Sequence, residues 1–559
     1  MTRLIISFLV SISILFSQPF QVGKNGVVVS ASQIASDVGI EVLKLGGNAV
    51  DAAVAVGFAL AVVFPEAGNI GGGGFMVIRF PDNNSTTIDY REKAPGTASR
   101  DMYLSEKGDP IEGLSTEGVL SVGVPGSVAG YYLAWEKYGS IPWNELIEPA
   151  INLAEKGFPV SYYTKNGLLS HKDIMSRFPS SMEMFFPESG ILKIGENMCF
   201  PDLAKTLKNI SVKGRDGFYR GQTAKKIVKS VRKSGGIISL EDMKNYKAVE
   251  REPINFTYRE YNIISMPPPS SGGICLAEIL KTVEHFPLSD FEFQSSKFVQ
   301  ALVEAERRVY ANRAYFLGDP DFVKVPTEYL ISDELTTRLA KDIRFDKATP
   351  SSEITHVPEV SLMQESEQTT HFSIIDKDGM AVSNTTTLNS SFGSCFVAEG
   401  TGVLLNDEMD DFSIKPGYPN IYGLVGAEAN AIQPNKRMLS SMTPTIVSRN
   451  DSLMWILGTP GGATIITSVA QVIINLIDFD MDLIMAVDLP RFHHQWLPDV
   501  VFIEQFSFSK DIKDNLKAKG YTISERSKIG DVNAIAVDYE NGYYIGVPDK
   551  RRQSAAAAY

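Results

Sequence analysis

Cysteine and histidine are scarce in this chain of 559 residues, which contains three cysteines and six histidines. Cys199, Cys275 and Cys395 lie far apart and form no CxxC pair, which excludes a disulfide framework and a typical zinc site. His493 and His494 are adjacent, and adjacent side chains on a strand point to opposite faces. We therefore expect packing or hydrogen bonding from this pair, and no metal site.

Basic residues are also fewer than acidic residues. The chain has 53 lysine and arginine residues against 66 aspartate and glutamate residues, and its formal net charge is −13. No basic cluster occurs along the sequence, although neutralising the phosphates of a nucleic acid requires one. We therefore expect no nucleic-acid partner.

Apolar runs long enough to span a membrane, about 20 residues, are missing as well. A run of apolar and small residues follows Arg3, extends from Leu4 to Phe16 and gives way to polar residues at Ser17. A positive start, an apolar core and a polar end are typical of a secretory signal. We predict a signal peptide over about residues 1–20 and export to a periplasm or the extracellular space. A membrane anchor is the alternative interpretation, and we expect no stable one.

The rest of the composition is typical of a folded protein with a large core, since 44% of the residues are hydrophobic and 21% are charged. Apolar residues at helical spacing from Ile34 to Leu45, followed by Gly46-Gly47, predict one helix. Asn48 is placed to cap a second helix over Ala49 to Val63. We expect a strand over Phe75 to Phe80.

A hairpin is the main local feature of the second half. Residues 346–368 are polar and predict an exposed connection, after which short strands follow. Alternating residues on both sides of Asp378-Gly379 predict two strands joined by a turn. If the turn has two residues, Lys377 pairs with Met380.

In that register Thr369 falls opposite Leu388, and Thr387 and Asn389 lie on one face within its reach. Threonine is a weak nucleophile unless a base lies beside it, and its own α-amine can serve when threonine is the first residue. This requires a cut between Gln368 and Thr369, by attack of the Thr369 hydroxyl on the preceding carbonyl. Because β-branched residues favour strands, threonines at a strand start are common, and this pattern alone does not establish a nucleophile.

Motifs along the whole chain strengthen that hypothesis. They are Gly71–Phe75, Arg91–Pro95, Pro267–Gly273, Thr369–Ser373, Thr387–Asn389, Glu408–Phe412, Pro434–Met442, Pro460–Gly462 and Pro490–Trp496. In this order they resemble the γ-glutamyltranspeptidase (glutathione hydrolase) family of N-terminal nucleophile hydrolases. The resemblance implies an α+β fold, a four-layer αββα sandwich. It also implies a precursor that cuts itself at Gln368–Thr369 into a large subunit, residues 21–368, and a small catalytic subunit, residues 369–559, which stay together as a heterodimer.

The resemblance also implies roles for single residues. Thr369 becomes the nucleophile and new amino terminus, and Thr387 holds it in position. The α-amino group of the γ-glutamyl donor binds Asn389, Glu408 and Asp411, and its α-carboxylate binds Arg91, with Ser440 and Ser441. Carboxylates suit an ammonium group, and a guanidinium fork matches a carboxylate. Without the resemblance, residues 408–411 would read as a solvated acidic turn and Arg91 as a surface ion pair.

Three further segments have expected roles. Gly461 and Gly462 precede a helix predicted over Ala463 to Asp480, so their amides lie where negative charge is favoured, and we predict that they stabilise the oxyanion. Gly71 to Gly74 precede a strand, which favours close backbone packing. The loop from Ser413 to Lys436 is interpreted as a lid that carries Tyr422 over the donor pocket, with an inert surface loop as the alternative.

Five residues depart from what is usual in the family, although none is a named catalytic group: Asn384, Thr386, Met438, Ala463 and Thr464. We expect them to affect the surroundings of the oxyanion site, the acceptor preference or the rate.

The resemblance implies a two-step acyl transfer without a metal or an organic cofactor. Thr369 takes the γ-glutamyl group from glutathione or another γ-glutamyl compound and passes it to water or to an amino-acid or peptide acceptor. Two alternatives stay open. One is the same fold acting as a β-lactam side-chain acylase or a poly-γ-glutamate transferase, and the other is an uncleaved, non-catalytic secreted binding protein.

Overall fold

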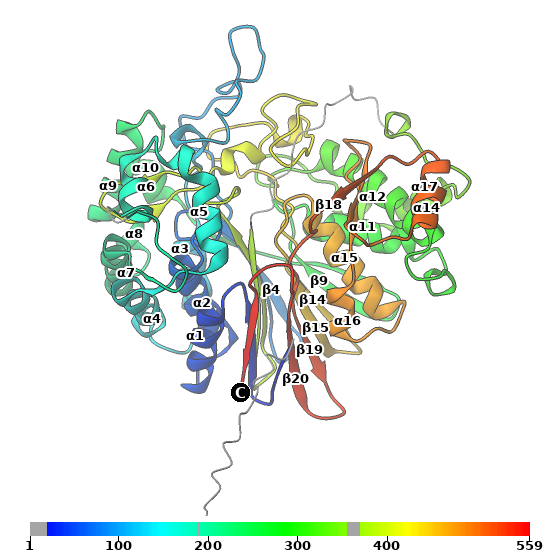
Figure 1. Ribbon diagram of the computed structural model, residues 1–559, viewed down its shortest axis with the longest axis horizontal. Coiled ribbons are helices and arrows are strands. Elements are labelled where there is room, and N and C mark those ends of the chain that lie inside the picture. The colour runs from blue at the N-terminus through cyan, green and yellow to red at the C-terminus, as the bar shows by residue number, and fades with distance from the viewer. Residues whose placement is uncertain (1–19, 188–189, 355–368) are drawn as a thin grey trace, which may run out of the picture.

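The computed structural model describes residues 20–187, 190–354 and 369–559, and two seven-stranded sheets run through its centre (Figure 1). The predicted signal peptide lies outside these residues except for its last position, and so does Gln368 of the predicted cut. No helix in the described ranges combines the length and the apolar character that crossing a membrane requires.

One sheet has the predicted hairpin at its centre, and all neighbouring strands in it are antiparallel. Its strands, in spatial order, are β21 (Ala555–Ala558), β2 (Gly26–Ser30), β10 (Thr370–Asp376), β11 (Ala381–Thr387), β3 (Gly73–Arg79), β4 (Ser85–Asp89) and β7 (Val249–Arg251). The strand predicted over Phe75 to Phe80 is β3.

The second sheet is also antiparallel throughout. Its order is β1 (Gln21–Gly23), β20 (Tyr543–Pro548), β19 (Asn533–Asp538), β15 (Ser452–Gly458), β14 (Thr445–Arg449), β9 (Tyr261–Ser265) and β8 (Ile254–Tyr258). Smaller sheets pair β5 (Phe158–Pro159) with β6 (Asn197–Met198), β12 (Val397–Ala398) with β13 (Val403–Leu404), and β17 (Val501–Glu504) with both β16 (Phe492–His493) and β18 (Ile523–Arg526).

Helices form the two outer layers (Figure 1). The first sheet is covered by α1 (Gln33–Lys44), α2 (Ala49–Val63), α3 (Ser127–Tyr138), α4 (Trp143–Lys156), α5 (Tyr162–Met175), α6 (Pro179–Phe185), α7 (Pro201–Lys213), α8 (Asp216–Tyr219), α9 (Gly221–Lys233) and α10 (Leu240–Asn245). On the side of the second sheet lie α11 (Gly272–Val283), α12 (Ser296–Phe316), α13 (Thr327–Leu330), α14 (Asp333–Lys341), α15 (Thr464–Ile477), α16 (Leu483–Asp488) and α17 (Lys510–Ala518).

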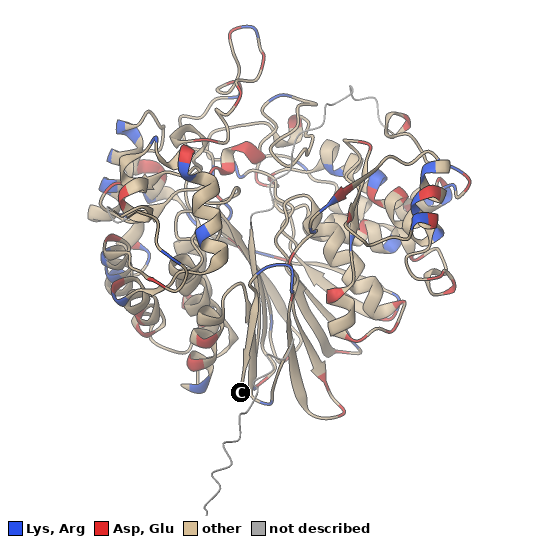
Figure 2. Ribbon diagram, in the orientation of Figure 1, with Lys and Arg blue, Asp and Glu red and all other residues tan. Residues whose placement is uncertain are grey.

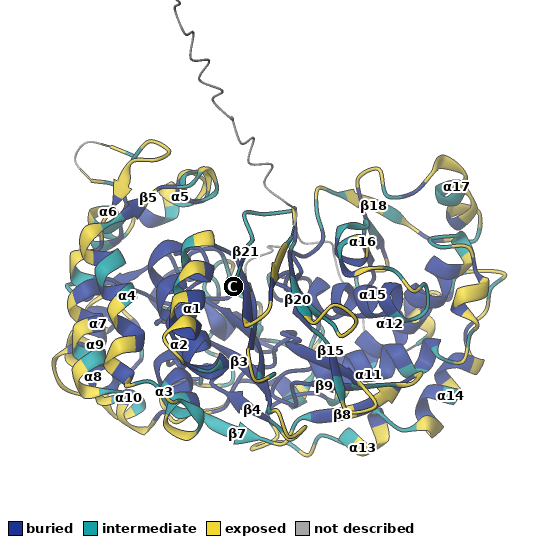
Figure 3. Ribbon diagram, turned by 90° about the horizontal axis from the view of Figure 1, so that it is seen from below, coloured by how far each residue is buried: buried dark blue, intermediate teal, exposed yellow. Residues whose placement is uncertain are grey.

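Three apolar cores fill the spaces between these four layers. Val29, Val77 and Ile375 of the first sheet pack against Ile446 and Ile456 of the second. Two larger cores join each sheet to its own helices, and buried residues fill the sheets and the inner faces of the helices (Figure 3). Charged residues gather on the outer helices and loops (Figure 2). The expected αββα sandwich is confirmed.

The sequence accounts well for the first two helices. α1 and α2 match the predicted helices, and Asn48 caps α2 by accepting hydrogen bonds from the amides of Val50 and Asp51. The Asp51 side chain accepts in turn from the Asn48 amide, 3.0 Å away, which completes a capping box. Every residue of α2 is buried, which explains why the helix has no polar face.

The hairpin is present, but the predicted register is wrong by one residue. Thr370 pairs with Thr386, and the pairing continues to Ile375 and Ala381. The turn has three residues instead of two, because the Asp376 carboxylate accepts hydrogen bonds from the amides of Asp378 and Met380, and Gly379 adopts a φ of +85°. Extended by one pair, this register brings Thr369 opposite Thr387.

Both sheets combine strands from either side of position 369. β10, β11 and β21 lie among β2, β3, β4 and β7, while β14, β15, β19 and β20 lie among β1, β8 and β9. The two expected fragments therefore share two sheets and the apolar core between them. A break before Thr369 would leave both fragments held by these contacts.

Candidate active site

Two threonine hydroxyls meet at the start of β10. Thr369 precedes the strand, is 3% exposed, and its Oγ1 lies 3.4 Å from Oγ1 of Thr387 at the end of β11. Thr387 Oγ1 also accepts a hydrogen bond from the Asn389 amide, at 2.8 Å. Thr387 thus couples the Thr369 hydroxyl to the backbone that carries Asn389.

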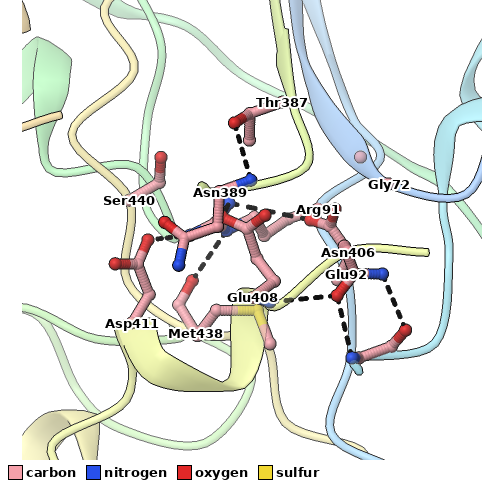
Figure 4. Close-up of polar contacts among 12 residues, drawn as sticks. Gly72, Arg91, Glu92, Thr387, Asn389, Asn406, Glu408, Asp411, Met438 and Ser440 are labelled. Carbon is pink, nitrogen blue, oxygen red and sulfur yellow. Dashed lines mark hydrogen bonds and ion pairs between the residues drawn. The ribbon is translucent and has the colours of Figure 1, made fainter. Parts of the chain in front are cut away.

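A buried charge cluster lies next to this pair. The Arg91 guanidinium is fully buried and forms ion pairs with the carboxylates of Glu408 and Asp411. It also donates hydrogen bonds to the carbonyl oxygens of Met438 and Leu439, both at 3.3 Å. Figure 4 shows Arg91 between residues from separate segments of the chain. The alternative readings of a surface ion pair and a solvated acidic turn do not apply, because these groups face the interior.

Burial dominates the electrostatics of the cluster. It raises the pKa values of the Glu408 and Asp411 carboxyls, and the attraction of Arg91 opposes this rise. Glu92, which lies 3.6 Å from Arg91, is also fully buried. Burial and the nearby Glu408 carboxylate raise the Glu92 pKa well above its ordinary value. One guanidinium therefore faces three carboxyl groups.

Nearly all predicted site residues line one small cavity. Its walls include Thr369, Thr387, Asn389, Arg91, Glu408, Asp411, Tyr422, Ser440, Ser441 and Gly462, together with Leu424, Met442 and Ile465. Gly461 directly precedes Gly462 in the sequence but does not itself line the cavity. The fold thus brings together side chains from positions 91 to 465 at the end of the central hairpin.

The glycine pair lies at the start of α15, as predicted. Gly461 and Gly462 have positive φ angles of +137° and +54°, and their carbonyls accept hydrogen bonds from the amides of Thr464 and Ile465. Among the described residues, neither glycine amide has a backbone acceptor. These amides are therefore free to bind a negative oxygen at the helix start.

The loop that contains Tyr422 covers the cavity. The Tyr422 hydroxyl donates a 2.6 Å hydrogen bond to the Asn389 carbonyl, and its own carbonyl accepts one from Gln495. The ring is 4% exposed and packs so closely on Gly462 that a methyl group there would overlap it. This contact fits the interpretation of the loop as a lid and disfavours an inert surface loop.

The remaining predictions concern structural residues. A side chain at Gly71 or Gly72 would overlap the carbonyl oxygen of Leu404 or Thr387, so the glycine run serves close backbone packing. His493 and His494 are buried, and they form hydrogen bonds with Thr467, Gln495 and Asp499. Cys275 and Cys395 are buried, and all three cysteines are free.

Comparison with known proteins identifies the family to which this chain belongs. Residues 35–559 match the family model described as Gamma-glutamyltranspeptidase. The chain belongs to the γ-glutamyltranspeptidase family. It is 47% identical to the glutathione hydrolase proenzyme of Escherichia coli (strain K12) over 529 residues, which cover 94% of this chain and 90% of that protein.

Two solved structures are also similar. The crystal structure of the Helicobacter pylori γ-glutamyltranspeptidase matches with 44% identity and a TM-score of 0.58, over 58% of this chain and 94% of that chain. The crystal structure of cephalosporin acylase from Bacillus halodurans matches with 26% identity and a TM-score of 0.84, over 97% of both chains. The resemblance seen in the sequence is thus confirmed, and this family member is an enzyme.

Three of the residues that depart from the family pattern contact the groups that form the site. Thr464 donates its hydroxyl to the Gly461 carbonyl at 2.8 Å, and the Ala463 carbonyl accepts from the Tyr310 hydroxyl. Met438 is buried, and its carbonyl is one of the acceptors for Arg91. These contacts support the glycine pair and the charge cluster without replacing any reacting group.

Several residues that shape the site had no recognised role in the sequence. Asn406 donates from its amide nitrogen to the carbonyls of Gly71 and Gly123, at 2.8 and 2.9 Å, while its oxygen accepts from the amide of Glu408. Asn420 donates to Asp411 at 2.8 Å. Glu92 directly follows Arg91 in the sequence, which is the one local signal that could have drawn attention to it.

Proposed function

We propose that this enzyme cuts itself before Thr369 and then transfers γ-glutamyl groups, from glutathione and related amides, to water or to amino-acid and peptide acceptors. The observation that carries the proposal is the cavity that joins the Thr369 hydroxyl to a buried guanidinium, two carboxylates and a glycine amide. The glutathione hydrolase proenzyme name of the Escherichia coli relative supports both the substrate and the processing.

In the acylation step, the Thr369 hydroxyl attacks the γ-carbonyl carbon of the donor. The free α-amine of the same residue takes the proton, and Thr387 holds the hydroxyl in place. The amides of Gly461 and Gly462 stabilise the tetrahedral oxyanion. The amine then leaves with a proton, and water or an acceptor amine attacks the resulting ester and releases the γ-glutamyl group.

Donor recognition follows from the charge cluster. The α-ammonium of the donor binds near Asn389, Glu408 and Asp411, which supply a carbonyl and carboxylates. The α-carboxylate binds Arg91, with hydroxyl groups from Ser440 and Ser441. These groups are complementary to a free α-amino acid, so we expect a donor without the α-amino group to react poorly.

The mature enzyme is proposed to be a heterodimer of its own two fragments, approximately residues 21–368 and 369–559. The strands that each fragment contributes to both sheets would hold them together after the cut. Its small partners are glutathione, other γ-glutamyl compounds and amino-acid acceptors. We also propose export to a periplasm or the extracellular space, which the apolar segment over residues 4–16 supports.

The decisive experiment combines processing with substrate choice. We expect the purified protein to run as two fragments on a denaturing gel, with the amino terminus of the smaller one at Thr369. We also expect release of glutamate from glutathione and rapid cleavage of γ-glutamyl-p-nitroanilide, with glutaryl-p-nitroanilide cleaved at least about 100-fold more slowly. An intact chain with no hydrolysis would favour the binding-protein alternative.

The acylase alternative has one specific observation in its favour, the similarity to the cephalosporin acylase structure over 97% of both chains. A preference for the glutaryl compound in the same assay would support it. The buried carboxylates of Glu408 and Asp411 argue against this outcome, because a glutaryl group offers them no ammonium partner.

Replacing Gly462 by alanine is expected to lower kcat for γ-glutamyl-p-nitroanilide by about 100- to 1000-fold, the usual effect of losing an oxyanion donor. A side chain is strained at a φ of +54° and would overlap the Tyr422 ring, so the amide must move. Steady-state kinetics measures the effect. Gly379→Ala is the matched control, since Gly379 has a φ of +85° in open space at the hairpin turn. If Gly462→Ala and Gly379→Ala have equal effects on kcat, the oxyanion role is wrong.

A further inference from the structure

Arg313 of α12 is a second buried guanidinium behind the cavity. It is 5% exposed and does not line the cavity itself. Its Nε donates a 2.9 Å hydrogen bond to the Ser271 hydroxyl, and its Nη2 donates a 3.1 Å hydrogen bond to the Ser441 hydroxyl. Arg313 therefore contacts one of the two serines that line the cavity.

The charge of Arg313 is attracted by the Asp411 carboxylate, but the two groups do not form an ion pair. Arg91 forms ion pairs with three carboxylates, and Arg308 of the same helix pairs with Glu304 at 2.7 Å. No carboxylate in the described ranges lies at ion-pair distance from Arg313. A buried charge without an ion-pair partner is costly, so the place of Arg313 behind the cavity makes it a candidate for a role toward a charged ligand.

The hydrogen bond from Arg313 fixes the role of the Ser441 hydroxyl, whose oxygen accepts from Arg313. A guanidinium can only donate, so the Ser441 oxygen must accept and its hydrogen remains available for another acceptor. Ser441 lines the cavity, and none of its contacts among the described residues takes up that hydrogen. The hydroxyl is thus prepared to donate into the cavity, with its polarity enhanced by the adjacent cation.

A second connection reaches Ser440 through the loop that precedes α11. The Ser271 hydroxyl accepts from Arg313 and donates to the Ser440 carbonyl at 2.6 Å, and the Ser271 amide donates to the same carbonyl at 2.8 Å. This contact fixes the backbone of Ser440 beside the cavity. The Pro267–Gly273 loop, which the sequence marks as a motif, therefore holds part of the site.

We propose that Arg313 is a positioning residue, which sets the Ser441 hydroxyl as a hydrogen-bond donor for the α-carboxylate of the donor and fixes the backbone of Ser440 beside it. The proposal rests on the proposed function and deepens it. Arg91 is shared with three carboxylates, so Arg313 supplies the additional positive charge that favours a carboxylate in this part of the cavity. Arg313 thereby contributes to the selection of donors that carry an α-carboxylate.

The test compares two donors in the full-length enzyme. One is γ-glutamyl-p-nitroanilide, and the other is 4-aminobutyryl-p-nitroanilide, which lacks only the α-carboxylate. Arg313→Met is expected to raise KM for the first about 10- to 100-fold, with little change in kcat, because a charge-assisted hydrogen-bond network is lost. Its kcat/KM for the second donor should stay close to that of the unaltered enzyme.

Arg308→Met is the matched control, since it removes another buried arginine of α12 that contacts Glu304 and Thr349 away from the cavity. It should leave the ratio of kcat/KM for the two donors unchanged. Equal losses for both donors in Arg313→Met, or no loss at all, would overturn the proposal, because a purely structural role cannot distinguish the donors.

Two further variants keep the test decisive if Arg313→Met does not fold. Ser271→Ala removes the acceptor of Arg313 that lies outside the cavity, and it should lower the same ratio through Arg313. Ser441→Ala also removes a group that contacts the donor, and it should lower the ratio further. An unchanged ratio in both variants would also overturn the proposal. If the unaltered enzyme fails to cleave γ-glutamyl-p-nitroanilide, the proposed function itself is wrong, and this outcome is visible before any variant is compared.

Discussion

Thr369→Ala is expected to leave the chain as one uncut polypeptide, with cleavage of γ-glutamyl-p-nitroanilide reduced at least about 10⁴-fold. The substitution removes the hydroxyl that attacks the preceding carbonyl, and the uncut chain then has no free α-amine to act as the base. Both reactions thus fail for one reason. A denaturing gel and a spectrophotometric assay of the same sample measure the two effects.

Thr369→Ser is the matched control for this prediction. Serine keeps the hydroxyl and, once the chain is cut, the α-amine, so both processing and activity should survive at a lower rate. The Thr369 methyl group is the only part removed, and the 3.4 Å approach to Thr387 involves the hydroxyl that remains. Complete processing of Thr369→Ala would show that another residue performs the cut.

The sequence predicted local structure well where short-range signals decide it. The Asn48 cap and the apolar run from Ala49 to Val63 specify α2 without help from the rest of the chain. The hairpin was predicted as well, but its register was not, because a side chain decides the loop length. The Asp376 carboxylate accepts two amide hydrogen bonds and favours a three-residue loop, and no strand pattern reveals this contact.

The site was predicted through motifs, and its supporting residues were not. Residues such as Arg91 and Asp411 stand in recognisable segments, so the resemblance identified them one by one. Arg313 has no such signal, because it contacts Ser441 across 128 residues of sequence. The place of the charge cluster in the pocket was predicted only through the resemblance, since a run such as Glu408–Asp411 normally faces solvent and only the packed fold encloses it.

Arg91→Met is expected to abolish donor binding and to destabilise the folded protein by about 3–5 kcal/mol, the usual effect of removing one partner from a buried ion pair. Arg91 is fully buried, and its guanidinium is the partner of both Glu408 and Asp411 and lies 3.6 Å from Glu92. Methionine fills much of the space but leaves these carboxyl groups without a counter-charge. Arg449→Met is a suitable control, because it breaks an exposed pair with Glu260 and should change stability little.

The destabilisation of Arg91→Met should grow as the pH rises. In the unaltered protein burial already raises the pKa values of Glu92, Glu408 and Asp411, and without Arg91 these values rise further because only the attraction is lost. A carboxyl whose pKa is raised by folding binds more protons in the folded state, so its contribution to stability is present at low pH and is lost as the pH rises through the folded pKa. Thermal unfolding of both proteins at pH 5 and pH 8 measures this, and the difference in melting temperature should be larger at pH 8. A difference that is independent of pH, or larger at pH 5, would mean that the three carboxyl groups do not depend on Arg91 for their charge.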